Sequence, residues 1–76
     1  MNRTVQAFIR EGEDGWFVAE CLNLPVVTQG HTLDETIAHL REAVELALEG
    51  EDPAVFGLES NNPPITVTLE VPARAA

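Results

Sequence analysis

The sequence predicts an α+β fold: a two-layer sandwich of order β-β-β-α-β, in which one helix packs on an antiparallel four-stranded sheet. Three observations predict it. An amphipathic run from about Leu33 to Glu49 indicates the helix. Three strand-like segments precede this run, and one follows it. The chain has 76 residues, so we expect a single domain over residues 1–72, with a frayed tail at 73–76.

The first two expected strands are Thr4–Arg10 and Trp16–Leu22. The acidic turn between them contains Asp14 and Gly15, and Asp-Gly is among the strongest short hairpin signals. Alternation with a period of two places three apolar residues of the first strand on one face: Val5, Ala7 and Ile9.

A short third strand is expected at Val26–Gln29 and the fourth at Ile65–Val71. Apolar and polar residues alternate along the fourth strand more clearly than anywhere else in the chain. We therefore expect its apolar residues to face the core: Ile65, Val67, Leu69 and Val71.

The junction between the third strand and the helix carries the most specific local signals. Gly30 permits a tight backbone passage out of the strand. Thr32 and Glu35 form a predicted capping box, and Gly50 is placed to end the helix in a left-handed conformation. The apolar stripe of the helix comprises Leu33, Ile37, Leu40, Val44, Ala47 and Leu48.

The chain is strongly acidic. Thirteen acidic residues, four arginines and no lysine give a net charge of -9. Such a field repels phosphate backbones, so we expect no direct binding of DNA or RNA. It favours a basic protein partner, with solubility alone as the alternative explanation.

Few residues suggest catalysis. His31 and His39 are the candidate general bases, but neither accompanies a nucleophile at a recognisable spacing, so we expect both to be structural or exposed. Cys21 lies in an apolar strand and is expected to be buried and inert. The sequence has no metal-ligand cluster and no glycine-rich phosphate loop, so no catalytic residue, metal or cofactor is predicted. With a lone thiol and neither a signal peptide nor a membrane-length apolar run, we expect a cytoplasmic protein.

Three segments together resemble the HicB-like antitoxin family, in its short form that consists of the N-terminal domain: Glu13–Cys21, Val27–Glu35 and Leu40–Leu46. The resemblance covers nearly the whole chain. The sequence departs from the family pattern at Leu24-Pro25-Val26, where a Pro-Gly pair is usual, and at Thr36, where alanine is favoured.

The resemblance implies a fold like a partial RNase H or double-stranded-RNA-binding domain. It also implies a function: neutralising a small basic mRNA-cleaving toxin of the HicA type by masking its catalytic surface. Two alternatives remain open. One is a metal-dependent, RNase-H-like nuclease that uses the abundant carboxylates, and the other is an orphan ligand-sensing domain.

We expect the partner to bind at the acidic hairpin and the aromatic residue beside it, with Glu20 on the adjoining strand. The predicted binding residues are Glu11, Glu13, Asp14, Trp16 and Glu20. Because a chain of this size has a small core, we also expect a homodimer or higher homo-oligomer. The residues expected to be buried by this self-association are Val26, Val27, Val55 and Phe56.

Overall fold

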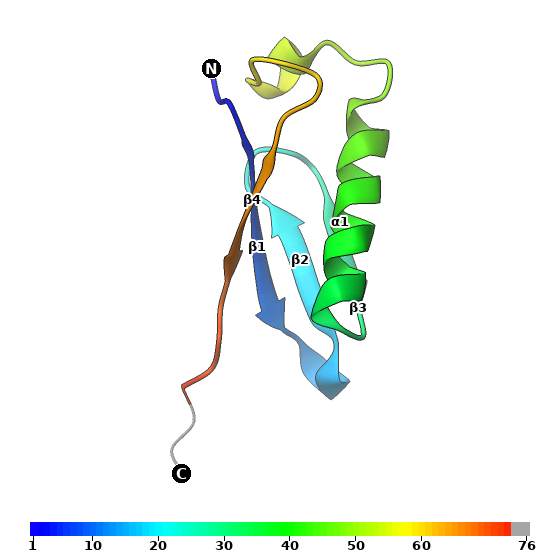
Figure 1. The fold of residues 1–76 in the computed structure, drawn as a ribbon, viewed down its shortest axis with the longest axis vertical. Coiled ribbons are helices and arrows are strands. Elements are labelled where there is room, and N and C mark those ends of the chain that lie inside the picture. Colours follow the sequence, from blue (N-terminus) through cyan, green and yellow to red (C-terminus); the bar gives the residue numbers. More distant parts are fainter. Residues whose placement is uncertain (74–76) are drawn as a thin grey trace.

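The structure, a computed structural model, describes residues 1–73 of the chain. Its longer elements are β1 (Val5–Glu11), β2 (Phe17–Cys21), β3 (Val27–Gly30), α1 (Leu33–Leu48) and β4 (Ile65–Leu69). Short 3-10 helices occupy Glu13–Gly15 and Pro53–Phe56. Figure 1 shows α1 lying along one face of the sheet. The predicted α+β class, with one long helix and four strands in the described residues, is confirmed. The tail expected at 73–76 lies, apart from Ala73, outside these residues.

The sheet is mixed, with strand order β3-β2-β1-β4, so the prediction of an antiparallel sheet is wrong for β4. β2 is antiparallel to both β1 and β3, whereas β4 is parallel to β1, with Val5 opposite Ile65 and Ile9 opposite Leu69. Connectivity explains the direction. β1 and β3 run in the same direction. α1 follows β3 and carries the chain back along the sheet, so β4 begins at the end of the sheet where β1 begins and runs parallel to it (Figure 1).

The core lies between α1 and the face of the sheet made by alternate residues of β1 and β2. Val5, Ala7 and Ile9 are buried there as predicted, and Leu40, Val44 and Leu48 of the helical stripe cover them. The remaining buried hydrophobic residues are Ala19, Leu24, Val26 and Leu58.

The start of α1 rests directly on the end of β3. The hydroxyl of Thr32 accepts a hydrogen bond from the amide of Glu35 at 3.0 Å, which confirms the Thr32 half of the predicted capping box. The hydroxyl of the fully buried Thr36 donates to the carbonyl of Thr32 at 2.7 Å. A Cβ atom on Gly30 would lie only 2.6 Å from the Thr36 Oγ1 and 2.8 Å from its backbone nitrogen. A glycine is therefore needed at position 30. At the other end of the helix, Gly50 has the predicted left-handed φ of 73°.

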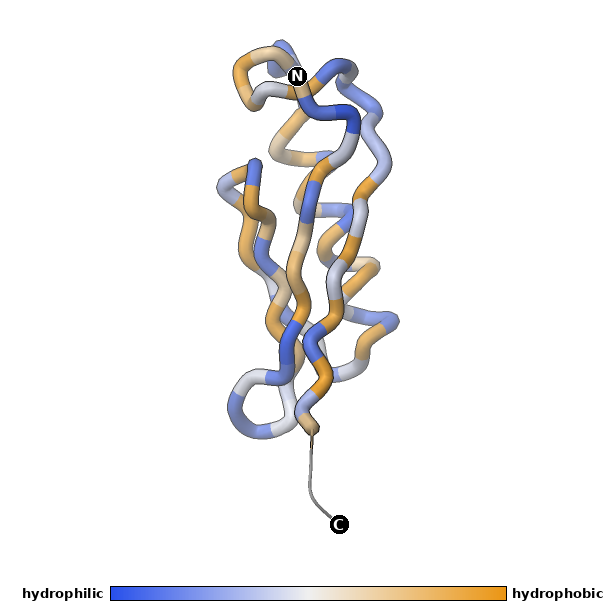
Figure 2. The backbone as a smooth tube through the Cα atoms, turned by 90° about the vertical axis from the view of Figure 1, so that its left-hand side faces the viewer, coloured by the Kyte–Doolittle hydropathy of each residue, from blue (hydrophilic) through white to orange (hydrophobic). Residues whose placement is uncertain are grey.

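β4 is much less buried than predicted. Ile65 packs against the core, but Val67 is 36%, Leu69 42% and Val71 72% exposed. The side chains of Val67 and Leu69 are on the predicted face, because these residues pair with the buried Ala7 and Ile9 of β1, but α1 packs on β3 and β2 at the other side of the sheet. Val71 lies beyond the end of β4. Figure 2 shows hydrophobic and hydrophilic residues alternating along this outer strand. The alternation predicted the face, and the position of the helix determined the burial.

Two residues of the expected self-association surface belong to the core instead. Val26 is buried, and Phe56 is half-buried against the core cluster. Val27 and Val55 are exposed, but they lie in different parts of the chain. The apolar character of Val26 and Phe56 is therefore explained within one chain.

We predict unequal costs for truncating two residues of the helical stripe. Leu40→Ala should lower the free energy of unfolding by about 2–5 kcal/mol, because it leaves a cavity in the core where Leu40 is only 1% exposed. Ile37→Ala should cost clearly less, because Ile37 is half-buried at the open side of α1. Urea titration of both variants measures the difference, and equal costs would contradict the described position of the helix.

We also predict that Gly30→Ala destabilises the fold by roughly 1–3 kcal/mol, because the new methyl group overlaps Thr36. The double variant Gly30→Ala/Thr36→Ala should not restore stability, since the backbone nitrogen of residue 36 remains 2.8 Å from the added atom. Thermal melts test both variants. A double variant as stable as Thr36→Ala alone would show that only the hydroxyl group opposes a side chain at position 30.

Candidate protein-binding face

The sheet has one face that α1 does not cover. Strand alternation places on it the residues of β1 and β2 that lie between the buried positions. The register sets Phe8 beside Glu20, and Glu20 beside Val27 in turn. In the same way, Arg10 is paired with Val18. We call this surface the open face, formed by Phe8, Arg10, Trp16, Val18, Glu20 and Val27.

Trp16 occupies the end of the open face near the β1–β2 hairpin. It lies one residue before β2, and His31 lies one residue after β3, so the two continue the antiparallel pairing by one step. Their ring centroids are 3.6 Å apart, with an angle of 37° between the planes. Trp16 remains half-buried and His31 exposed. Trp16 therefore lies outside the core cluster, and the imidazole ring holds the indole in place at the surface.

Glu20 lies farther along the open face and forms an ion pair. Its Oε1 is 3.3 Å from Nη1 of Arg10, and the two side chains are 45% and 43% exposed. A pair this exposed contributes only about 0–1 kcal/mol to stability. Its chief consequence is that a guanidinium and a carboxylate are held in known positions on a surface that also carries Phe8 and Val18.

The acidic turn of the hairpin contains Glu13 and Asp14, whereas Glu11 is the last residue of β1 and lies by alternation on the helix side of the sheet. Glu11, Glu13 and Asp14 are all exposed. The turn is tight because Asp14 and Gly15 both have positive φ, 59° and 77°. Of the five predicted binding residues, the structure places Glu13 and Asp14 in the turn and Trp16 directly after it. Glu20 lies on the open face with Trp16, whereas Glu11 is at the end of β1 on the other face of the sheet.

Sequence reasoning missed Phe8 and Val18 of the open face, and it assigned Val27 to self-association. A usable signal was present. A single helix can cover only one face of a sheet. In each strand, the residues that alternate with the predicted core residues therefore lie on the uncovered face.

The remaining candidates for chemistry have structural surroundings. Nδ1 of His39 is 2.7 Å from the carbonyl oxygen of Gln29, so this side chain ties α1 to β3. Cys21 is half-buried against the core, which corrects the expectation of full burial, and desolvation raises the pKa of its thiol. In residues 1–73, no group of three or more His, Cys, Asp or Glu is arranged to hold a metal ion. No helix in that range has the length and apolar character needed to cross a bilayer.

We predict that Cys21 reacts slowly with a thiol reagent in the folded protein. Its raised pKa lowers the thiolate fraction near neutral pH, and the thiolate is the nucleophile. The rate with a disulfide reagent at pH 8 should be well below that of the same chain in denaturant. Because the folded pKa is the higher one, stability should also fall as pH rises above the pKa of the unfolded thiol. Equal rates in the two states would contradict the burial of this side chain.

Comparisons of the chain with protein-family models, with curated proteins and with solved structures find no match.

Proposed function

We propose that this chain is a protein-interaction module that binds a small basic protein through the open face and the acidic hairpin tip. The observation that carries the proposal is an uncovered sheet face bearing Trp16, Phe8 and Arg10, next to exposed carboxylates. Tryptophan and arginine are enriched among the residues that dominate binding energies. Carboxylates at the rim raise the rate of encounter with a cationic partner.

Within this proposal, the partner is a small basic mRNA-cleaving toxin of the HicA type, and the chain acts as a HicB-like antitoxin in the cytoplasm. The support is the resemblance in the hairpin, the glycine corner and the capped helix, together with the net charge of -9. The proposal includes the partial RNase H or double-stranded-RNA-binding-like fold that the resemblance implies. A basic surface that binds RNA is chemically suited to an acidic competitor, which would block RNA by occupying the same surface.

The test uses the small basic protein encoded by the reading frame next to the gene of this chain. Both proteins are purified, their binding is measured, and cleavage of RNA by the basic protein is followed with increasing amounts of this chain. We expect a stable complex and loss of cleavage at stoichiometric amounts. The absence of a basic neighbour, or a neighbour that neither binds nor is inhibited, would overturn the antitoxin proposal.

A control within this assay decides the nuclease alternative. The chain alone is incubated with RNA, and with an RNA–DNA hybrid, in the presence of Mg²⁺. We expect no cleavage. Cleavage that disappears when a single carboxylate is replaced would establish an enzyme in place of an interaction module.

We predict that the location of the charge matters as well as its amount. The double variant Glu11→Lys/Glu13→Lys changes the hairpin tip, and Glu51→Lys/Glu59→Lys makes the same change of net charge at the other end of the molecule (Figure 1). At low salt the tip variant should bind the basic partner about 10-fold more slowly or worse, since steering acts where the partner docks. The control variant should bind at a rate closer to that of the wild type. Stopped-flow association rates measure both, and equal effects would place the interface elsewhere.

A further inference from the structure

β4 is an edge strand whose outer backbone groups have no partner in the described residues. The amide of Val5 donates to the carbonyl of Pro64 at 3.0 Å, and the amide of Glu70 donates to the carbonyl of Ile9 at 2.8 Å. Even-numbered residues therefore direct their backbone groups toward β1. Because these directions alternate along a strand, the N–H and C=O groups of Ile65, Val67 and Leu69 point away from the sheet.

The two edges of the sheet differ in protection. At the β3 edge, the side chain of His39 reaches the carbonyl of Gln29, and α1 packs against the strand. The β4 edge has no such cover within residues 1–73. Natural proteins guard exposed edges with charges, prolines, bulges or a covering element. β4 has no charged residue and no proline between Ile65 and Leu69.

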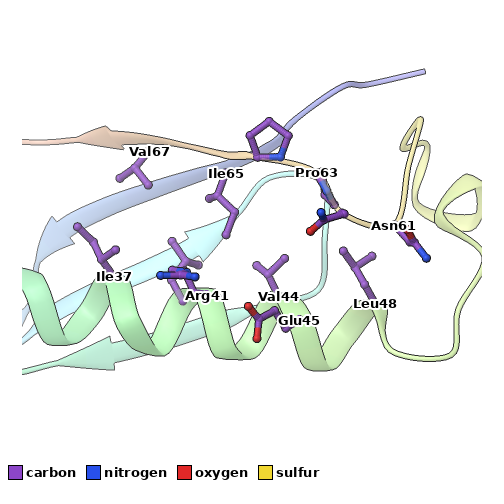
Figure 3. A pocket seen from close by; sticks show the side chains of 12 residues that line it. Ile37, Arg41, Val44, Glu45, Leu48, Asn61, Pro63, Ile65 and Val67 are labelled. Atoms are coloured by element: carbon purple, nitrogen blue, oxygen red, sulfur yellow. The ribbon is translucent and has the colours of Figure 1, made fainter.

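The side chains beside this edge are apolar and partly uncovered. A groove of about 320 Å³ separates β4 from α1. In Figure 3, Ile65 and Val67 extend from β4 toward the helix, and Ile37 lies across the groove from them. β4 therefore combines unpaired backbone N–H and C=O groups at its outer edge with apolar side chains beside them. Binding by strand addition uses both of these features.

We propose that β4 pairs with β4 of a second copy of this chain. The two strands run antiparallel about a two-fold axis, and the two four-stranded sheets become one continuous sheet. With Val67 opposite its own copy, Ile65 lies opposite Leu69, and Thr66 lies opposite Thr68. Apolar side chains then meet on the helix side and hydroxyls on the other side, where cross-strand pairs stabilise the sheet.

The composition of the strand selects a second copy over a basic partner. A cationic segment would find no carboxylate between Ile65 and Leu69, whereas a second β4 matches it in apolar character and hydrogen-bonding positions. Each chain carries a net charge of -9, yet this pairing sets no two charged residues directly opposite each other. The pairing requires an N–H at the outward-facing residues Ile65, Val67 and Leu69. None of these is a proline, since the nearest prolines are residues 63, 64 and 72.

This inference does not depend on the proposed function. The two-fold axis runs perpendicular to the joined sheet, so both copies of α1 lie on one side of it and both open faces on the other. The open faces remain uncovered, and each dimer would present two of them in the same direction. Loss of the dimer can therefore be distinguished from failure to bind a basic protein.

The experiment is sedimentation of the full chain at roughly 100 µM in about 0.5 M salt, where repulsion between the acidic chains is screened. We expect the wild type at twice the 8.3 kDa mass of one chain. Val67→Pro removes an outward N–H without removing a bond to β1, and proline is tolerated at such edge positions. Val67→Lys places a charge on the apolar flank. We expect both variants to be monomers with an unchanged far-UV spectrum.

Gln6→Lys is the matched control. It adds the same charge at an exposed residue of β1, one strand away from the β4–β4 contact and on the face that the dimer leaves uncovered, so the dimer should persist. If Val67→Pro fails to fold, Leu69→Lys replaces it, because Leu69 is already exposed. A monomeric wild type would overturn the proposal. Dimers that survive Val67→Lys and Leu69→Lys would also overturn it, because the copies would then associate through another surface.

Discussion

The close packing of the first turn of α1 on Gly30 is the constraint on which the rest of this structure depends. With no side chain at Gly30, the backbone of Thr36 approaches the end of β3, and the buried Thr36 hydroxyl is satisfied by the carbonyl of Thr32. The Nδ1 contact of His39 with Gln29 lies one helical turn further on. These contacts hold α1 over β3 and β2. The helix is therefore too far to one side to cover β4, and the groove and the exposed flank of β4 follow.

The acidity of the chain is compatible with this fold because no Asp or Glu in the described residues is buried. Several acidic residues even occupy unfavourable places. The last turn of α1 contains no basic residue, while Glu45 and the C-cap residue Glu49 lie near the negative end of the helix dipole. Each costs a few tenths of a kcal/mol when exposed. Burial of Leu40, Val44 and Leu48 outweighs this cost. The acidic residues thus lower the stability of the C-terminal end of α1, while the negative charge of the whole chain favours encounter with a cationic surface.

The two proposed interfaces use different physics. The open face joins aromatic rings, an arginine and a nearby acidic rim, which suits a partner of opposite charge. The β4 edge offers backbone hydrogen bonds and uncharged side chains, which suit a second copy. Because one lies on a face of the sheet and the other at its edge, both can be occupied at the same time.

The sequence by itself determined the local structure. Alternation, the Asp-Gly turn, the Thr32 cap and Gly50 specify strands, hairpin and helix ends, because each depends on residues only a few positions apart. The tertiary structure alone decided three matters. The parallel direction of β4 follows from the number of times the chain crosses the sheet. The exposure of Val67 and Leu69 follows from where the helix lies, and the contact between the Trp16 and His31 rings follows from the β2–β3 register. Each of these three features involves residues that are far apart in the chain. A local sequence pattern shows which residues share a face of a strand or helix, but it does not show which face another element will cover.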